Sequence, residues 1–302
     1  MNDIFIKKSA NRHILNSRTV MITVTLAAMG VFYLLFLIFP IIYAFIGSFF
    51  NWNPMMGKMD FTGIDNYVNV FQTPIFYKAF INTLIFTFVV TFFRVALGLM
   101  LAVFIDGLRY LKSFFRMVYF LPVVSSIIAI SLVWVWIFEP TSGILNQILN
   151  VFGIPSLGWL KDQYLALPSI MITTIWKDVG FSMVFYLAGL NNIPKSLYEA
   201  ADVDGAKRLQ KFFHIQLPML APQTMLIAVT GIITYIQLFD QVFMMTEKAG
   251  PNNATISLVY LLYDEAFNNF RFGTAAVIAF IIFLLTFVFS LIQMRLQNQS
   301  VN

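Results

Sequence analysis

The sequence has no cysteine and only two histidines, His13 and His214. Without cysteine the chain can form no disulfide, no thiolate nucleophile and no cysteine metal site. Two isolated histidines also argue against a histidine-based metal centre, because such sites usually combine several nitrogen or sulfur ligands. These absences argue against a metalloenzyme or a cysteine-dependent enzyme.

Charge is also scarce. Charged residues make up 11% of the chain and hydrophobic residues 59%, with 34 phenylalanines, whereas soluble domains carry roughly 25% charged residues. The mean hydropathy is +0.80. A soluble fold this poor in charge could not keep its surface hydrated. The composition therefore predicts that lipid is the solvent for much of the chain.

Six apolar segments are long enough to span a bilayer, which requires about 20 mostly apolar residues. They cover residues 20–46, 80–105, 117–138, 165–190, 219–245 and 272–294. The first is too long and too aromatic for the apolar region of a signal peptide. The second is interrupted by one charge, Arg94. The pattern predicts an all-α integral membrane protein with six transmembrane helices.

The distribution of lysine and arginine predicts the orientation of these spans. With both termini in the cytoplasm, twelve basic residues fall on inner segments and five on outer segments. The inner ones are Lys7, Lys8, Arg12, Arg18, Arg109, Lys112, Arg116, Lys195, Lys207, Arg208, Lys211 and Arg295, and the outer ones are Lys58, Lys78, Lys161, Lys248 and Arg271. The net charge of +5 is therefore interpreted as a topology signal. No nucleic-acid partner is expected.

The inner segment 191–218 differs from the other connections because its sequence is helical in pattern. Ser196 and Glu199 have the spacing of a capping box. Gly205 separates two helical runs and can take the positive φ that ends the first. Pro218 and Pro222 open the fifth span, where proline is tolerated. These features predict a helix–turn–helix, which by itself could be either a solvated linker or a docking element.

The run Leu-Tyr-Glu-Ala-Ala-Asp-Val-Asp-Gly-Ala, from Leu197 to Ala206, decides between these alternatives. With the Phe212, Ile215, Leu217 and Pro218 that follow, it resembles the EAA loop of binding-protein-dependent ABC importer permeases. An ordered series of positions extends the resemblance over roughly residues 75 to 295. The series includes Asn82, Gly98, Leu121-Pro122, Trp176, Gly180-Phe181, Ile193-Pro194, Phe239-Asp240 and Gly250-Pro251. Within the family the chain is most similar to the sugar-type subunits.

The resemblance implies the type I fold of ABC importer permeases and a bacterial or archaeal cell membrane location. It divides the chain into a cytoplasmic segment (1–19), a first transmembrane helix (20–46), an outer loop (47–79), a five-helix permease core (80–295) that includes the EAA loop (191–218), and a cytoplasmic tail (296–302). It also implies four kinds of partner: a second homologous permease subunit, two ATPase subunits, an extracytoplasmic sugar-binding protein and membrane lipid.

In relatives of this kind, the inner loop docks in a cleft of the ATPase. The docking residues expected here are Glu199, Ala200, Ala201, Asp202, Gly205 and Ala206. The chain contains no G-x-x-x-x-G-K-[ST] phosphate loop, which would cradle a nucleotide. We therefore expect no cofactor in this chain, no enzymatic activity of its own, and ATP and Mg bound by the partner ATPase.

Ionisable residues at membrane depth are costly and usually face a cavity or one another. Lys177 and Asp178 are adjacent in the fourth span, and Arg94 could pair with Asp178 or Asp240 or reach toward an interface. By resemblance to sugar importers, the substrate pathway is expected to be lined by Thr174, Lys177, Asp178, Phe181, Thr234 and Tyr235. For Lys177 and Asp178 the alternative is a structural ion pair between helices.

Two other functions are compatible with charged residues in the spans. In a stand-alone ion-coupled transporter, Arg94, Lys177 and Asp178 would be the coupling charges, but such a protein needs no EAA-like loop. A membrane-embedded enzyme lacks support because no catalytic carboxylate pair stands at a span end. The sequence therefore favours a permease subunit that imports sugars, oligosaccharides in particular, by alternating access.

Overall fold

The computed structural model describes the backbone of residues 2–299 and the side chains of residues 18–295. Lys7, Lys8 and Arg12, which were predicted to lie inside, and the predicted tail 296–302 fall outside the described side chains. Four helices in the described part are long and apolar enough to cross a membrane, and six spans result if two bent helix pairs each count as one.

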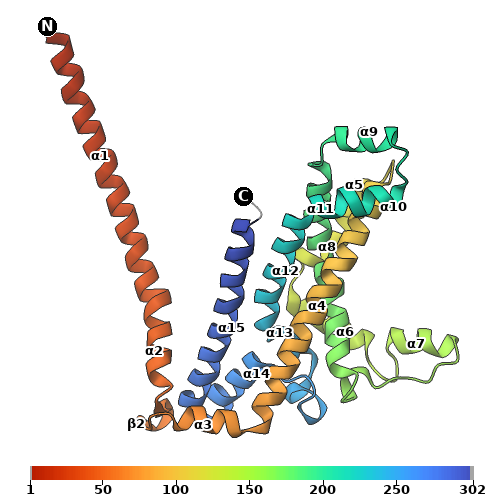
Figure 1. Cartoon of the computed structure of the whole chain (residues 1–302). Coiled ribbons are helices and arrows are strands. Elements are labelled where there is room, and N and C mark those ends of the chain that lie inside the picture. The colour runs from red at the N-terminus through yellow and green to blue at the C-terminus, as the bar shows by residue number, and fades with distance from the viewer. Residues whose placement is uncertain (1, 300–302) are drawn as a thin grey trace.

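The unbroken spans coincide with the first, second, fourth and sixth predicted segments. They are α1 (Asn2–Tyr33) continued through the π-helical η1 (Leu34–Ile38) into α2 (Phe39–Gly47), then α4 (Pro74–Asp106), α8 (Ala166–Asn191) and α15 (Phe272–Gln299). The start of α1 and the end of α15 lie at the same end of the molecule (Figure 1). This arrangement is expected for an even number of crossings.

The third and fifth spans are broken, whereas the sequence predicts continuous helices there. The third consists of α5 (Lys112–Val124) and α6 (Ile127–Ile137), which are bent by 99°. Pro122 lies inside α5 and lacks an amide donor for the helix ladder, and Ser125 after it is extended. The fifth bends by 61° before α12 (Ala221–Ile236), and a further break before Asp240 separates α13 (Asp240–Met245).

The inner connection between the fourth and fifth spans contains three short helices and one π-helical turn. They are α9 (Lys195–Val203), α10 (Arg208–Lys211), η4 (Phe212–Gln216) and α11 (Leu217–Met219). Figure 1 places α9 and α10 at the end of the molecule where α1 begins and α15 ends. The predicted helix–turn–helix is therefore present. Pro218 and Pro222 lie in the first turns of α11 and α12, as expected.

The opposite end carries short elements, including a β-hairpin that the all-α prediction missed. They are β1 (Phe50–Asn53), η2 (Pro54–Met56), β2 (Lys58–Phe61), α3 (Asp65–Gln72), α7 (Ile144–Val151), η3 (Trp159–Lys161), η5 (Glu247–Ala249), η6 (Pro251–Asn253), α14 (Leu258–Tyr263) and η7 (Asp264–Asn268). The antiparallel strands pair Phe50 with Phe61 and Asn53 with Lys58. The Asn53 side chain accepts from two amides of the turn, and Gly57 takes a positive φ of 62°. These local bonds explain why a hairpin forms in a hydrophobic chain.

Helix α8 is central and packs against α4, α5 and α12. Close contact depends on glycines: a Cβ atom on Gly98 would meet the Ser182 Cβ at 2.5 Å, and one on Gly180 would meet the Tyr119 carbonyl oxygen at 1.9 Å. Two hydrophobic clusters flank this region. After the sides that the sequence predicts, we call them the outer cluster, around Phe86, Ile170 and Ile236, and the inner cluster, around Ile105, Tyr186 and Leu220.

Glu139 organises the turn that leaves α6 on the outer side. Its Oε2 accepts hydrogen bonds from the amides and hydroxyls of Thr141 and Ser142, the amide distances both being 2.7 Å. These donors, led by the Ser142 amide, lower the pKa of Glu139 from its ordinary value of 4.5 to about 2. Because the folded pKa is depressed, the contribution to stability is present above pH 4.5 and is lost as pH falls toward 2.

We expect Glu139 to stay ionised at pH 3.5, where an unperturbed glutamate is mostly protonated. Glutamates labelled with ¹³C at the side-chain carboxyl can be titrated by NMR in micelles, and the chain has only four: Glu139, Glu199, Glu247 and Glu265. Glu139→Gln assigns the signal by its disappearance. A midpoint near 4.5 for that signal would contradict the prediction.

Candidate functional site

The inner loop is the first candidate site, and its two arms are tied together by polar contacts. The Gln216 side chain donates to the Tyr198 hydroxyl at 3.2 Å, and Lys211 forms an ion pair with Asp202. The Lys207 amide donates to the Gln210 side chain at 2.7 Å, which starts α10. Tyr198 also packs on the inner hydrophobic cluster. These contacts fix α9 at a defined position relative to the spans.

The predicted capping box of Ser196 and Glu199 is wrong. Pro194 precedes α9 with extended backbone angles, and no side chain caps the helix start. Ser196 therefore lies inside the first turn, too late to act as N-cap. Of the two roles considered for Glu199, capping is eliminated. Its carboxylate is exposed and free to meet a partner.

Gly205 ends α9 as predicted, with a positive φ of 72°. A Cβ atom there would meet nothing within 4 Å, so within this chain glycine is required for backbone conformation and not for space. The Ala206 amide donates to the Ala201 carbonyl at 2.8 Å, which is the bond expected beyond a glycine C-cap. The sharp turn brings α10 back beside α9.

A groove of about 350 Å³ lies between the two arms. Its lining residues are Ala201, Asp204, Gly205, Ala206, Gln210, Lys211, His214 and Ile215. The six expected docking residues thus divide into two sets. Ala201, Gly205 and Ala206 line the groove, whereas Glu199, Ala200 and Asp202 are exposed on α9, beside Val203 at 88% exposure. An exposed valine next to alanines suits a surface that a partner covers.

The second candidate site is a buried polar network at the boundary between the two hydrophobic clusters. It joins α4, α8 and α12 through Arg94, Asp178, Ser182 and Tyr235. Arg94 is only 6% exposed and Tyr235 only 3%. Charges this deep require partners, because an unpaired ion is expensive to remove from water.

The bonds form a continuous chain. Arg94 donates from Nε to Ser182 at 3.0 Å and from Nη1 to the Tyr235 hydroxyl at 3.2 Å. Tyr235 in turn donates to Asp178 Oδ2 at 2.9 Å. The Arg94 guanidinium also lies 4.8 Å from the ring centroid of Phe181, within the range of a cation–π contact. Arg94 therefore reaches Asp178 through Tyr235, and Asp240, at the start of α13, is not its partner.

Lys177 extends the network to a fourth helix. Its ammonium donates to Asp178 Oδ1 at 3.3 Å and to the Val123 carbonyl at 3.3 Å. Val123 is the penultimate residue of α5, next to the break that leads to α6. Lys177 and Asp178 thus pair with each other on one helix, whereas the alternative considered for them was an ion pair between helices, and both side chains stay partly exposed at 14% and 20%.

The remaining predicted pathway residues differ in accessibility. Thr174 is fully buried, and its hydroxyl donates to the Ile170 carbonyl at 2.9 Å. Phe181 is half-buried, and its ring contacts that of Phe185 at a tilt of 32°. Thr234 is exposed and donates to the Thr230 carbonyl at 2.8 Å. In the described chain, Lys177, Asp178, Phe181 and Thr234 are accessible, whereas Thr174 and Tyr235 lie in the packed interior.

Sequence reasoning missed Ser182 and the Val123 carbonyl. Ser182 follows Asp178 by four residues, which places both on one face of α8, so helical spacing could have suggested it. No sequence signal identifies a backbone carbonyl as a partner. Among residues 18–295, no group of three or more His, Cys, Asp or Glu residues could hold a metal ion.

Comparison with known proteins adds independent information. Residues 94–300 match the family described as binding-protein-dependent transport system inner membrane component. The chain is 36% identical to the lactose transport system permease protein LacF of Rhizobium radiobacter, covering 85% of this chain and 87% of that one. It is 32% identical to the arabinooligosaccharides transport system permease protein AraP of Bacillus subtilis, covering 88% and 85%.

A solved structure has a similar fold. It belongs to a bacterial ABC transporter involved in the import of the acidic polysaccharide alginate, with a TM-score of 0.83, 22% identity, and coverage of 95% of this chain and 98% of that one. The match spans nearly the whole length of both chains, so the broken spans and the inner loop belong to a known architecture.

Proposed function

The chain belongs to the family of binding-protein-dependent transport system inner membrane components, and from this premise we propose that it is a permease subunit of an ATP-driven sugar importer. The observation that carries the proposal is the inner loop, whose helix α9 is braced to the spans and exposes Glu199, Ala200 and Val203. A rigid projecting helix is suited to transmit motion from a partner.

The substrate class is a saccharide, and an oligosaccharide in particular. The proposal is supported by the relatives, whose names specify lactose and arabinooligosaccharides, and by hydrogen-bonding and aromatic side chains at the network. Hydroxyl groups of a sugar can bond to Lys177, Asp178 and Thr234, while the face of Phe181 suits a sugar ring. The pathway would pass these four accessible residues.

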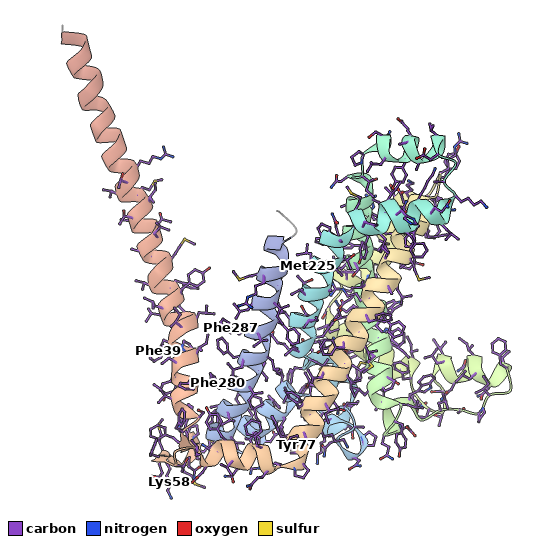
Figure 2. All side chains as sticks on the ribbon, in the orientation of Figure 1. Phe39, Lys58, Tyr77, Met225, Phe280 and Phe287 are labelled. Atoms are coloured by element: carbon purple, nitrogen blue, oxygen red, sulfur yellow. The ribbon has the colours of Figure 1, made fainter. Side chains whose placement is uncertain are left out.

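The partners would be two ATPase subunits on the inner side, a sugar-binding protein on the outer side and a second permease. The second permease is supported by the first span. None of the 18-residue apolar window in the segment Arg18–Gly47 is buried, and α1 diverges from α15 toward the inner end (Figure 1). Phe39 and Phe287 lie on the two diverging helices (Figure 2), and Phe45 contacts Phe280 nearer the outer end.

The network argues against a stand-alone ion-coupled transporter. Arg94, Lys177 and Asp178 are the charges such a mechanism would use, and all three are engaged with one another or with Tyr235. A coupling site must bind and release an ion, whereas these charged groups are already neutralised by hydrogen bonds and ion pairs with one another and with Tyr235. An importer that obtains its energy from ATP at the inner face needs no such site.

The test is reconstitution in proteoliposomes with the second permease, the ATPase and the sugar-binding protein. We expect ATP hydrolysis to rise several-fold when loaded binding protein is added, with concurrent sugar uptake. Glu199→Lys should lose both responses because it reverses the exposed charge of α9, while Glu199→Gln, which keeps the size, should retain most of them.

Insertion and co-purification of the second permease serve as controls for folding of the Glu199 variants. Uptake driven by an ion gradient without ATP would overturn the proposal.

For the pathway, Phe181→Cys and Thr234→Cys can be labelled selectively, since the chain has no native cysteine. Bound sugar should slow labelling at both positions, and unchanged rates would remove them from the pathway.

A further inference from the structure

The break between α5 and α6 leaves backbone carbonyl groups without helical partners, and the side chains of Ser125 and Lys177 satisfy two of them. A helix that ends inside a membrane presents carbonyl groups without helical partners. At the end of α5, Ser125 satisfies two of them: its hydroxyl donates to the Leu121 carbonyl at 2.9 Å, and its amide donates to the Pro122 carbonyl at 3.3 Å. The next carbonyl, that of Val123, accepts from Lys177 of α8.

The position of Lys177 suits a cation. A helix carboxyl end carries about half a negative elementary charge, and Lys177 Nζ lies 3.3 Å from the Val123 oxygen and 3.3 Å from Asp178 Oδ1. Only 14% of its side chain is exposed. The ammonium is therefore held between two negative groups, one on its own helix and one on the broken span.

Gly180 allows this contact because it brings the two backbones together. It lies one turn beyond Lys177 on α8, and its Cα faces the Tyr119 and Phe120 backbone of α5. On the other side, Asp178 bonds to Tyr235 of α12, which bonds to Arg94 of α4. The end of α5 is thus connected by hydrogen bonds to three other spans.

We propose that Lys177 is a positioning residue that sets the angle of the α5–α6 break and connects it to α4 and α12 through Asp178, Tyr235 and Arg94. When α8 moves, the break moves with it, so α6 follows the helices that the inner loop drives. The consequence for transport rests on the proposed function, but the structural role of Lys177 does not. The two can therefore be tested separately.

Ser131 provides a probe of the break. It lies on α6, is fully buried, and its hydroxyl has no hydrogen-bond partner among the described residues, so Ser131→Cys removes no bond. Ser169 of α8 is the control, because it is 1% exposed and lies outside the network, although Ser169→Cys removes the hydrogen bond from its hydroxyl to the Leu165 carbonyl. The absence of native cysteine makes each introduced thiol the sole target. N-ethylmaleimide labelling is measured on the full chain in membranes.

Lys177→Met keeps an unbranched side chain that is one atom shorter and removes its charge and donors. We expect it to raise labelling at Ser131→Cys by about tenfold while Ser169→Cys stays unlabelled, and Lys177→Arg to restore protection. Equal labelling at both positions would mean global unfolding and would overturn the proposal, as would unchanged protection at Ser131→Cys in Lys177→Met.

A second measurement concerns coupling in the reconstituted complex. Lys177→Met should keep ATPase binding, while the sugar imported per ATP falls several-fold even at saturating sugar, where weaker sugar binding has no effect, and Lys177→Arg recovers it. If the complex with the unaltered chain shows no ATP hydrolysis stimulated by binding protein, the proposed function fails, and the labelling result still decides the role of Lys177. Unchanged coupling in Lys177→Met alongside the labelling increase would overturn the transmission of motion through the break.

Discussion

A Gly205→Val variant is expected to insert normally, to keep its spans packed and to lose nearly all transport. Gly205 ends α9 with a φ of 72°, a conformation that costs an L-residue roughly 1–2 kcal/mol and a β-branched one more. The chain can avoid this cost only by displacing α9 against the Lys211–Asp202 ion pair and the hydrogen bond from Gln216 to Tyr198. Displacement of α9 would misplace Glu199, Ala200 and Val203 together.

The measurement is co-purification with the ATPase and ATP hydrolysis stimulated by loaded binding protein. With about 1.4 kcal/mol corresponding to a tenfold change in an equilibrium, we expect at least a tenfold loss of ATPase association. The melting temperature of the isolated chain should change little, because the turn is exposed and lies outside both hydrophobic clusters.

The Gly205→Asn variant distinguishes between two reasons why glycine is needed at this position, namely the backbone conformation and close approach of the ATPase. Asparagine tolerates the left-handed region, so this variant should keep α9 in place. If the backbone conformation is the requirement, Gly205→Asn retains most of the association. If instead the ATPase approaches Gly205 closely, Asn fails as Val does, even though the chain itself leaves space there. Full activity of Gly205→Val would contradict the assignment of this loop as the coupling element.

Structural features that depend on residues close together in the sequence could be predicted, and features that depend on contacts between distant residues could not. The spans were predictable because hydropathy over about 20 residues is a local property, and α4, α8 and α15 contain the predicted segments almost entirely. Gly205 was predictable because a turn depends on its own backbone. The capping box failed because Pro194 starts α9 earlier than the pattern suggests.

The breaks and the network were not predictable, since each depends on contacts between distant residues. Pro122 is compatible with a kinked but continuous span, and the 99° bend requires neighbours that satisfy the freed carbonyls. One of these neighbours is Lys177, 54 residues away in sequence. Arg94, Asp178 and Tyr235 were each singled out for other reasons, but only the fold places the tyrosine between the two charges.

The second large effect is expected from Gly180→Ala, which adds one methyl group where α8 crosses α5. The added Cβ would lie 1.9 Å from the Tyr119 carbonyl oxygen and 2.6 Å from its carbon. Both atoms belong to the backbone, so no side-chain rotation relieves the contact, and the two helices must separate. Overpacking typically lowers stability by about 1–3 kcal/mol. Because the clashing atoms belong to the backbone, we expect the loss for this variant to be at or above the upper end of that range.

Gly30→Ala is the matched control, because Gly30 also lies in a spanning helix and an added Cβ there meets nothing within 4 Å. Alanine is favoured over glycine in a helix interior by about 0.5–1 kcal/mol, so this variant should be neutral or slightly stabilised. We expect Gly180→Ala to melt roughly 3–10 °C lower than the unaltered chain in detergent, measured by fluorescence-detected size exclusion after heating.

Separation of the helices also predicts a specific consequence for the network. If α5 moves away from α8 in Gly180→Ala, the Val123 carbonyl leaves Lys177, whose present distance to it is 3.3 Å. The thiol of Ser131→Cys should then become reactive in Gly180→Ala, as in Lys177→Met, while that of Ser169→Cys remains protected. A melting temperature equal to that of the unaltered chain would show that the α5–α8 contact is looser than the structure indicates. If the variant is less stable but Ser131→Cys is still protected, the added methyl group displaces other parts of the helices and leaves the α5–α6 break unchanged.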